Sequence, residues 1–172
     1  MQSDTHPSLR AIDLAGFFLD RTGHSPYPMT DARLNMLLFL CQGHSMSRHG
    51  APLFTDDTFM TRSGPVVGDI TVTDADAAME GTWTAESLSA DQAALMYDVL
   101  LEYAEVRTDE MSDITSLFDQ YMDCDRAVPL DEIGKAFSDR QLPNHLLRMV
   151  MLGGELGYRD DRGRLILPED WE

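Results

Sequence analysis

The side chains best suited to acid–base or metal chemistry in this sequence are its five histidines. His44 and His49 fall in one predicted helix, but their spacing of five residues makes a poor pair of metal ligands on one helical face. Ser45 adjoins His44 in sequence, which does not by itself give the geometry of a nucleophile and its base. A hydrolase hypothesis with His44 as general base therefore requires a nucleophile and an orienting carboxylate within hydrogen-bond reach in a cleft. The remaining histidines, for which ordinary buried or surface roles fit best, are His6, His24 and His145.

Paired carboxylates suggest calcium loops, and two segments have them at the first and third positions of such a loop. The segments read DADAAMEGTWTA from Asp74 and DCDRAVPLDEIG from Asp123. Neither has glycine at the sixth position or glutamate at the twelfth, so an EF-hand is excluded for both. The sequence also lacks a Gly-x-Ser-x-Gly elbow, a phosphate-binding glycine-rich loop and a dinucleotide fingerprint. We therefore predict a protein that is not an enzyme, with no catalytic residue, no cofactor and no metal site.

The chain of 172 residues has a formal net charge of −17, from 30 acidic and 13 basic side chains. A surface this acidic repels phosphate groups, which disfavours nucleic acids and anionic membranes as partners. It favours either simple solubility or a partner with a basic surface. The two cysteines, Cys41 and Cys124, have no metal-binding or redox spacing and fit a reducing compartment. Because neither a signal peptide nor a membrane-spanning apolar run is visible, we expect a soluble cytoplasmic protein.

Apolar residues recur at helical spacing over most of the chain. The most apolar stretch follows Thr30, a good N-cap, and ends near Gly50. It is apolar on nearly every face, which indicates a buried central helix. Ser89 caps a later helix, and Pro129 and Pro143 open two more. The predicted helices are approximately Pro7–Thr22, Thr30–Gly50, Ser89–Tyr103, Thr108–Met122, Pro129–Phe137 and Leu142–Leu156.

A short hairpin is expected near residues 52–72. Thr58–Arg62 alternates like a strand, and Ser63–Val67 is predicted to be a turn with an apolar continuation. The pattern leaves both a strand and a short helix open for residues 65–78. Asp74–Glu86 is expected to be an exposed acidic loop.

The end of the chain predicts a second hairpin near residues 157–167, about a turn at Asp161–Gly163. No internal repeat, low-complexity tract or interdomain linker is visible. The expected fold class is therefore mainly α with small β elements, in a compact single-domain helical bundle.

Residues 29–70, which read MTDARLNMLLFLCQGHSMSRHGAPLFTDDTFMTRSGPVVGDI, carry a family pattern. The helix RLNMLLFLCQGHSMSRHG, the APLF step and the SGPVVGDI element resemble the Panacea domain family, which includes SocA-like antitoxins and GepA-like phage-associated proteins. Later, VPLDEIGKAFSD at Val128–Asp139 is similar to the closing helix of that family. Arg33 and Met36 stand where the family pattern has lysines, and Ser63 where it commonly has tyrosine.

The resemblance implies a tail over residues 1–8, a Panacea domain over 9–139, and a C-terminal extension over 140–172 that packs on the same domain as a helix plus hairpin. It implies a non-enzymatic protein-interaction module, an antitoxin of a type II toxin–antitoxin system or a proteolytic adaptor. The partner would be a toxin encoded by an adjacent gene. The alternative is a structural or regulatory protein of a phage or mobile element, in the form of a homodimer.

The candidate partner-binding residues are the positions that match the family motif, together with one tryptophan in the acidic loop. For the two phenylalanines the competing role is core packing, and for the Gly-Pro step it is a turn. The tryptophan is an aromatic anchor candidate, with a small cluster under its loop as the alternative. These residues are Phe54, Phe59, Met60, Arg62, Gly64, Pro65 and Trp83.

Overall fold

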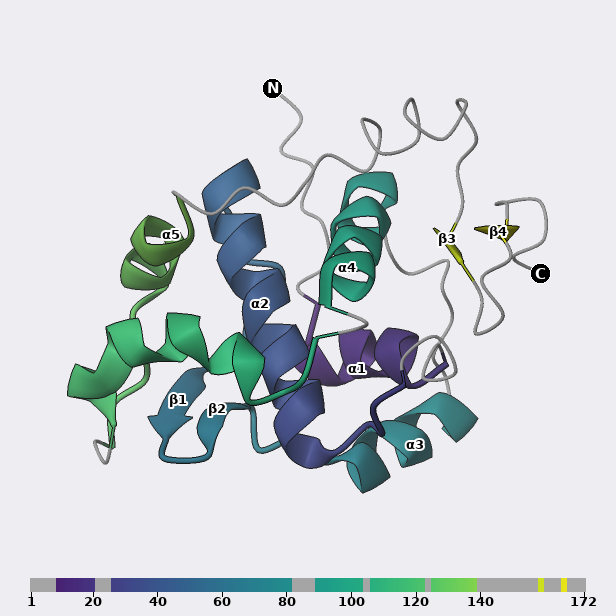
Figure 1. The fold of residues 1–172 in the computed structure, drawn as a ribbon, viewed down its shortest axis with the longest axis horizontal. Helices are drawn as coiled ribbons and strands as arrows, with labels where there is room; N and C mark the ends of the chain where they lie inside the picture. Colours follow the sequence, from purple (N-terminus) through teal and green to yellow (C-terminus); the bar gives the residue numbers. More distant parts are fainter. Residues whose placement is uncertain are drawn as a thin grey trace.

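The computed structural model describes residues 9–20, 26–81, 89–103, 106–122, 125–138, 158–159 and 165–166. Within them the chain is mainly helical with small antiparallel β elements, as the sequence predicts (Figure 1). The helices are α1 (Ala11–Asp20), α2 (Asp31–His49), α3 (Val72–Gly81), α4 (Ala90–Tyr103), the 3₁₀ helix η3 (Glu110–Tyr121) and α5 (Leu130–Ser138). The strands are β1 (Thr58–Thr61), β2 (Gly64–Val67), β3 (Tyr158–Arg159) and β4 (Leu165–Ile166).

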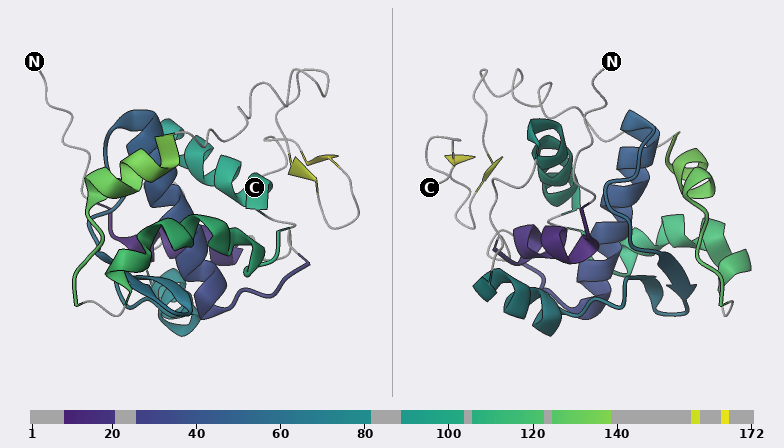
Figure 2. Two further views of the ribbon diagram at one scale, coloured as in Figure 1. Left: turned by 60° about the vertical axis from the view of Figure 1, so that its left-hand side comes forward. Right: turned by 180° about the vertical axis from the view of Figure 1, so that it is seen from behind.

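Helix α2 is the centre of the fold, which confirms the prediction of a buried central helix. Thr30 caps its start, because the Thr30 hydroxyl accepts a hydrogen bond of 3.2 Å from the Arg33 N–H. Gly50 ends it in the left-handed conformation (φ 67°) and donates its N–H to the Met46 carbonyl. Every residue from 33 to 45 is buried, so neighbouring elements surround this part of the helix (Figure 2).

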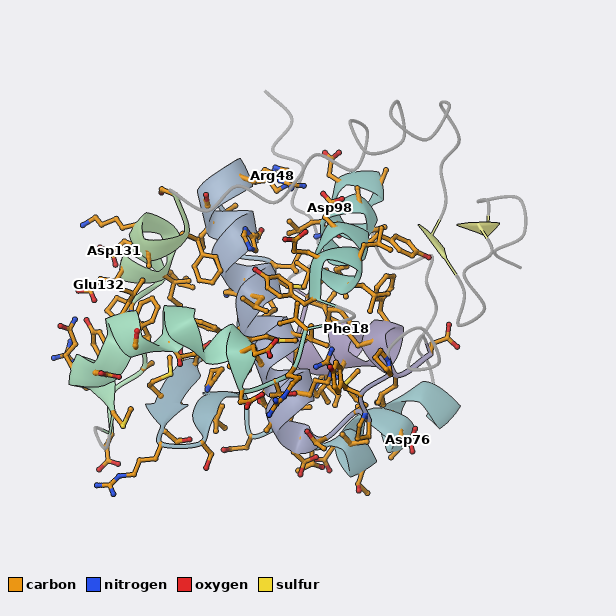
Figure 3. All side chains as sticks on the ribbon, in the orientation of Figure 1. Phe18, Arg48, Asp76, Asp98, Asp131 and Glu132 are labelled. Carbon is orange, nitrogen blue, oxygen red and sulfur yellow. The ribbon has the colours of Figure 1, made fainter. Side chains whose placement is uncertain are left out.

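Helices α1 and α4 pack together beside α2 through aromatic side chains. The Phe17 ring meets the Phe18 ring at 5.6 Å and the Tyr97 ring at 4.9 Å, both edge to face. Near the end of α2, Arg48 Nη1 lies 2.8 Å from Asp98 Oδ2 of α4 (Figure 3). This ion pair joins the C-terminal end of α2 to α4.

Helix α5 packs on the opposite flank of α2 at short range (Figures 1 and 2). A Cβ atom on Gly43 would stand 2.3 Å from the Phe137 ring, so only glycine allows this approach. The same ring packs edge to face against Phe39 at 5.6 Å and His44 at 4.9 Å. Ile133 and Phe137 are fully buried, which confirms the inward face predicted for this helix.

Strands β1 and β2 form the hairpin predicted near residues 52–72. Arg62 and Ser63 make its turn, and Gly64 follows with φ 112°, a conformation that favours glycine. One face of the hairpin is buried and the other is half-buried. The buried residues are Thr58, Met60, Pro65 and Val67, and the half-buried ones are Phe59, Thr61, Gly64 and Val66.

Residues 65–78, for which the sequence pattern allowed either a strand or a helix, contain one of each. Strand β2 runs to Val67, and α3 begins at Val72. The prediction of an exposed acidic loop from Asp74 is therefore wrong for residues 74–81, which are helical. Residues 82–86 of that predicted loop lie outside the described residues.

Helix α3 forms because its start is capped reciprocally. The Thr71 hydroxyl accepts a hydrogen bond of 3.1 Å from the Asp74 N–H, and the Asp74 carboxylate accepts one of 3.2 Å from the Thr71 N–H. Asp31 of α2 also accepts the Val72 N–H at 2.7 Å. Ala75 is fully buried on the inner face. Capping and burial therefore outweigh the acidic composition that suggested a loop.

The helix predicted to follow Thr108 is present as η3, but it is a 3₁₀ helix with a kink. Phe118 has non-helical backbone angles (φ −115°, ψ 18°) at the kink. Its buried ring packs edge to face on Phe39 at 5.6 Å. Tyr121 donates a hydrogen bond to the Glu132 carboxylate, which connects η3 to α5.

Strands β3 and β4 pair in antiparallel fashion, with Tyr158 opposite Ile166, and confirm a hairpin near residues 157–167. The turn expected between them, the tail over 1–8 and the helix predicted over 142–156 lie outside the described residues. The boundaries expected for the domain and its extension remain predictions.

Candidate functional site

The tip of the hairpin and η3 enclose a cavity of about 380 Å³. Figure 1 shows η3 beside the hairpin, with α2 next to the hairpin on its other side. The cavity thus combines residues from three separate parts of the sequence. Its lining residues are Met36 of α2, residues 60–64 of the hairpin (Met60, Thr61, Arg62, Ser63 and Gly64), and Thr108, Asp109, Thr115 and Met122 of the η3 segment.

Methionine side chains give the cavity its apolar part. Met36 and Met60 are 3% and 2% exposed, and Met122 is half-buried. Methionine is flexible and polarisable, so a surface built from it adapts to apolar groups of different shape. The other lining side chains are mainly hydroxyls and two charged groups, Arg62 and Asp109. An apolar floor with a polar rim is the usual composition of a protein-binding hot spot.

The hairpin wall is held by hydrogen bonds within its turn. The Thr61 hydroxyl donates to the Gly64 carbonyl at 2.8 Å and accepts the Ser63 N–H at 3.2 Å. The positive φ of Gly64 completes the turn without strain. Arg62, at the tip of this turn, is exposed at the cavity.

The opposite wall is held by Arg33, a buried residue of α2. Its guanidinium donates to the carbonyls of Tyr103 and Val106, both at 2.8 Å, and to the Thr108 hydroxyl at 3.3 Å. The guanidinium also lies 5.4 Å from the centre of the Tyr27 ring. Burial lowers the pKa of Arg33. Arg33, which stands where the family pattern has lysine, therefore binds the carbonyl at the C-terminal end of α4 and fixes the start of the η3 segment.

Two buried polar side chains of α2 fix the hairpin segment from behind. Gln42 accepts the Leu53 N–H at 2.7 Å and donates to the Phe54 carbonyl at 3.0 Å. Asn35 accepts the Val67 N–H at 2.7 Å and donates to the Ile70 carbonyl at 2.9 Å. These bonds satisfy backbone groups that would otherwise be buried without partners. The hairpin is thereby set rigidly on α2.

The structure places the predicted site residues in different environments. Met60, Arg62 and Gly64 line the cavity. Phe54 is 1% exposed and belongs to the core, which agrees with the packing alternative for this residue. Two others do not line the cavity: Pro65 is buried, and Phe59 is half-buried on the outer face of the hairpin. Trp83 lies outside the described residues.

Sequence reasoning missed Met36, the hairpin residues Thr61 and Ser63, and the four residues of the η3 segment that line the cavity. Met36 replaces a lysine of the family pattern, and that departure was the one available signal. No local pattern marks Thr115 or Met122, because the crossing of η3 over the hairpin is a tertiary contact.

The geometry required by the hydrolase hypothesis is not met by the serines beside His44. The Ser45 hydroxyl donates to the Ala51 carbonyl at 2.8 Å, and the Ser47 hydroxyl donates to the Phe137 carbonyl at 3.2 Å. The His44 ring is 4% exposed and packs against Phe137. The two hydroxyl protons are therefore directed to backbone carbonyls and not to the imidazole.

Within the described part of the chain, no group of three or more His, Cys, Asp or Glu side chains could hold a metal ion. Burial raises the pKa of the Cys41 thiol well above its usual range. None of the described helices combines the length and the apolar character needed to cross a bilayer.

Comparisons of the chain with protein-family models, curated proteins and solved structures give no match. The resemblance to the Panacea family therefore remains a prediction from the motif at residues 29–70.

Proposed function

We propose that this protein is a non-enzymatic protein-interaction module of the antitoxin or proteolytic-adaptor kind, which binds a partner at the cavity between the hairpin and η3. The observation that carries the proposal is the convergence of Met60, Arg62 and Gly64, from the motif-bearing segment, on a cavity with an apolar floor and a polar rim. The resemblance of residues 29–70 to Panacea antitoxins and adaptors supplies the expected class of partner, a toxin.

The negative charge of this chain favours a partner with a basic surface. The chain has a net charge of −17, and acidic side chains outnumber basic ones by four to one between residues 106 and 122, the segment that lines the cavity. Complementary charge speeds association and selects partners. A cytoplasmic location, where such a partner would be synthesised, is part of this proposal.

Co-expression with the product of the adjacent gene tests the proposal. We expect the two proteins to purify together and growth to be restored where the neighbour is toxic. Failure of both would overturn the function. Light scattering on the isolated protein separates partner binding from self-association, the alternative form.

A matched pair of charge reversals locates the binding face. Asp109 lines the cavity, whereas Asp76 is exposed on α3, across α2 from the hairpin (Figure 3). Asp109→Lys and Asp76→Lys change the net charge equally. We expect Asp109→Lys to weaken capture of the partner and Asp76→Lys to leave it nearly unchanged. Equal effects would show that net charge alone governs binding and would contradict a site at the cavity.

A further inference from the structure

The cavity is large enough for one aromatic side chain. Cavities of about 150 Å³ already accommodate a benzene ring. The cavity between the hairpin and η3 has about 380 Å³ and leaves room for an indole or phenol ring. It is small for a folded segment, so a partner would insert a side chain and lay its backbone outside.

The lining favours an aromatic side chain over an aliphatic one. Three methionines, Met36, Met60 and Met122, are among the residues that line the cavity. Sulfur–aromatic contacts add about 0.3–1.5 kcal/mol to simple burial, which an aliphatic side chain does not gain. Thr108 and Thr115 line the same cavity, and a threonine hydroxyl suits the N–H or O–H of a tryptophan or tyrosine. The Thr108 hydroxyl also accepts a hydrogen bond of 3.3 Å from Arg33.

The surroundings of the cavity favour basic residues beside that anchor. The Asp109 side chain is 66% exposed at the lining and pairs with Arg107, whose Nη2 lies 2.8 Å from Asp109 Oδ2. Over residues 106–122 as a whole, four acidic side chains stand against this one basic side chain. Glu110 and Asp119 are also exposed on η3. A basic partner segment passing along η3 would meet these carboxylates, whereas an acidic segment would be repelled.

From these observations, and resting on the proposed function, we propose that the cavity receives a single aromatic side chain from a partner segment whose flanking residues are basic. The aromatic ring packs among Met36, Met60 and Met122, while the flanking cations face Asp109 and the other carboxylates of η3. This names the chemistry of the partner and does not depend on which gene encodes it.

Binding of synthetic peptides to the full chain, followed by fluorescence anisotropy, tests this inference. The probe is a short labelled peptide of alanine and lysine with one central tryptophan, and two matched peptides replace tryptophan with alanine or the lysines with glutamates. We expect each replacement to weaken binding at least about tenfold. Equal binding of the tryptophan and alanine peptides would overturn the aromatic anchor, and equal binding of the lysine and glutamate peptides would overturn the basic flanks.

Protein variants that fill the cavity locate the anchor. Thr115→Trp places a ring in the lining, and Leu117→Trp places one on the 55% exposed side chain position of the same helix, which does not line the cavity. We expect Thr115→Trp to weaken the tryptophan peptide at least about tenfold and Leu117→Trp to leave its affinity within about twofold. Ser63→Trp, at the exposed turn of the opposite wall, repeats the test if circular dichroism shows that Thr115→Trp disturbs the fold. Unchanged affinity in a folded cavity variant would overturn the inference.

The two proposals fail in different ways. If the neighbouring gene product binds the unmodified protein and the Thr115→Trp variant equally well, the interaction function stands and the aromatic anchor is wrong. If that product does not bind but the tryptophan peptide occupies the cavity, the partner assignment is wrong and the anchor stands.

Discussion

The two flanks of α2 are packed by different chemistry. On one flank α5 lies against the helix through apolar contacts, with the Phe137 ring directly over Gly43. On an adjacent face of α2, the hairpin segment is held by Asn35 and Gln42, whose buried amides bond to its backbone. The α5 side has one hydrogen bond to α2, from the Ser47 hydroxyl to the Phe137 carbonyl at 3.2 Å, whereas the two amides make four with the hairpin segment.

The difference explains how the cavity keeps its shape. Apolar packing fixes volume and tolerates exchange of similar side chains, whereas paired amides fix the register of the chain they bind. The amides of α2 fix the segments before and after the hairpin strands, at Leu53–Phe54 and at Val67–Ile70. The hairpin tip can therefore present its cavity residues without being packed itself.

Gly43→Ala should produce the largest loss of stability, because it breaks the apolar flank. The added methyl group would stand 2.3 Å from a ring that is fully buried and has no room to move aside. We expect a loss of about 3 kcal/mol in the free energy of unfolding, the upper end of the usual cost of overpacking. Chemical denaturation followed by circular dichroism measures it.

Gly134→Ala is the matched control on α5. Its added methyl group would meet Met46 Cβ at 3.4 Å, an ordinary contact distance. Since alanine is about 0.5–1 kcal/mol better than glycine within a helix, this variant should be neutral or slightly stabilising. Equal destabilisation by the two substitutions would show that the close approach at Gly43 does not matter.

Gln42→Leu should have the next largest effect, because it removes the amide that serves the hairpin segment. The Leu53 N–H and the Phe54 carbonyl would both be left buried without that partner. We expect a loss of about 2 kcal/mol, within the range for buried polar groups left unsatisfied. On the apolar flank, Met46→Leu keeps volume and should cost less than about 1 kcal/mol. If the two substitutions cost the same, the proposed contrast between the flanks is wrong.

Thr71→Ala should cost about 1 kcal/mol, the usual value of an N-cap. The hydroxyl of Thr71 accepts the Asp74 N–H, and no other residue of α3 can replace it at that position. Thr71→Ser keeps the hydroxyl and should restore most of the stability. Hydrogen exchange of the α3 amides distinguishes local fraying of this helix from global destabilisation, and unchanged exchange in Thr71→Ala would contradict the capping role.

Thr71 also shows what the sequence made predictable. Local signals predicted α2 with its N-cap Thr30 and its end near Gly50, and the first strand of the hairpin, whereas the second strand was left open between strand and helix. The Thr71–Asp74 pair was an equally local signal, and composition was wrongly weighted above it. Capping chemistry is set by particular side chains at fixed spacing, so it is a stronger guide than acidic content.

The cavity was only half predictable, for a physical reason. Met60, Arg62 and Gly64 belong to one continuous segment, so a motif could mark them. Met36 comes from α2, where its neighbour Asn35 accepts a hydrogen bond from Val67 at the end of β2. The η3 wall depends on the kink and on Arg33, neither of which leaves a local pattern in the sequence. Sites that are assembled across elements in this way need the fold before they can be seen.

The smallest loss of stability is expected on removal of the hydrogen bond between Tyr121 and Glu132, which joins η3 to α5. Glu132 lies on the outer side of α5, where water competes for its carboxylate (Figure 3). Donation to this carboxylate raises the pKa of Tyr121 above its usual value. The pKa of Tyr121 is about 10 in the unfolded chain and higher in the folded chain. The hydrogen bond therefore stabilises the fold fully at pH values below the pKa of the unfolded chain, and this stabilisation is lost as pH rises through the pKa of the folded chain.

Tyr121→Phe should therefore lower the free energy of unfolding by a constant amount at neutral pH, and the gap to the unmodified protein should close in alkali. Urea denaturation of both proteins across this range measures the gap and cancels the titration of every group that they share. Glu132→Gln, which keeps an acceptor without its charge, should return the pKa of Tyr121 towards its usual value in an absorbance titration of the phenolate. A gap that widens as pH rises would show that the hydroxyl does not donate to Glu132, and the hydrogen bond of 3.2 Å from Gln120 to that carboxylate would then be the side-chain bond that joins η3 to α5.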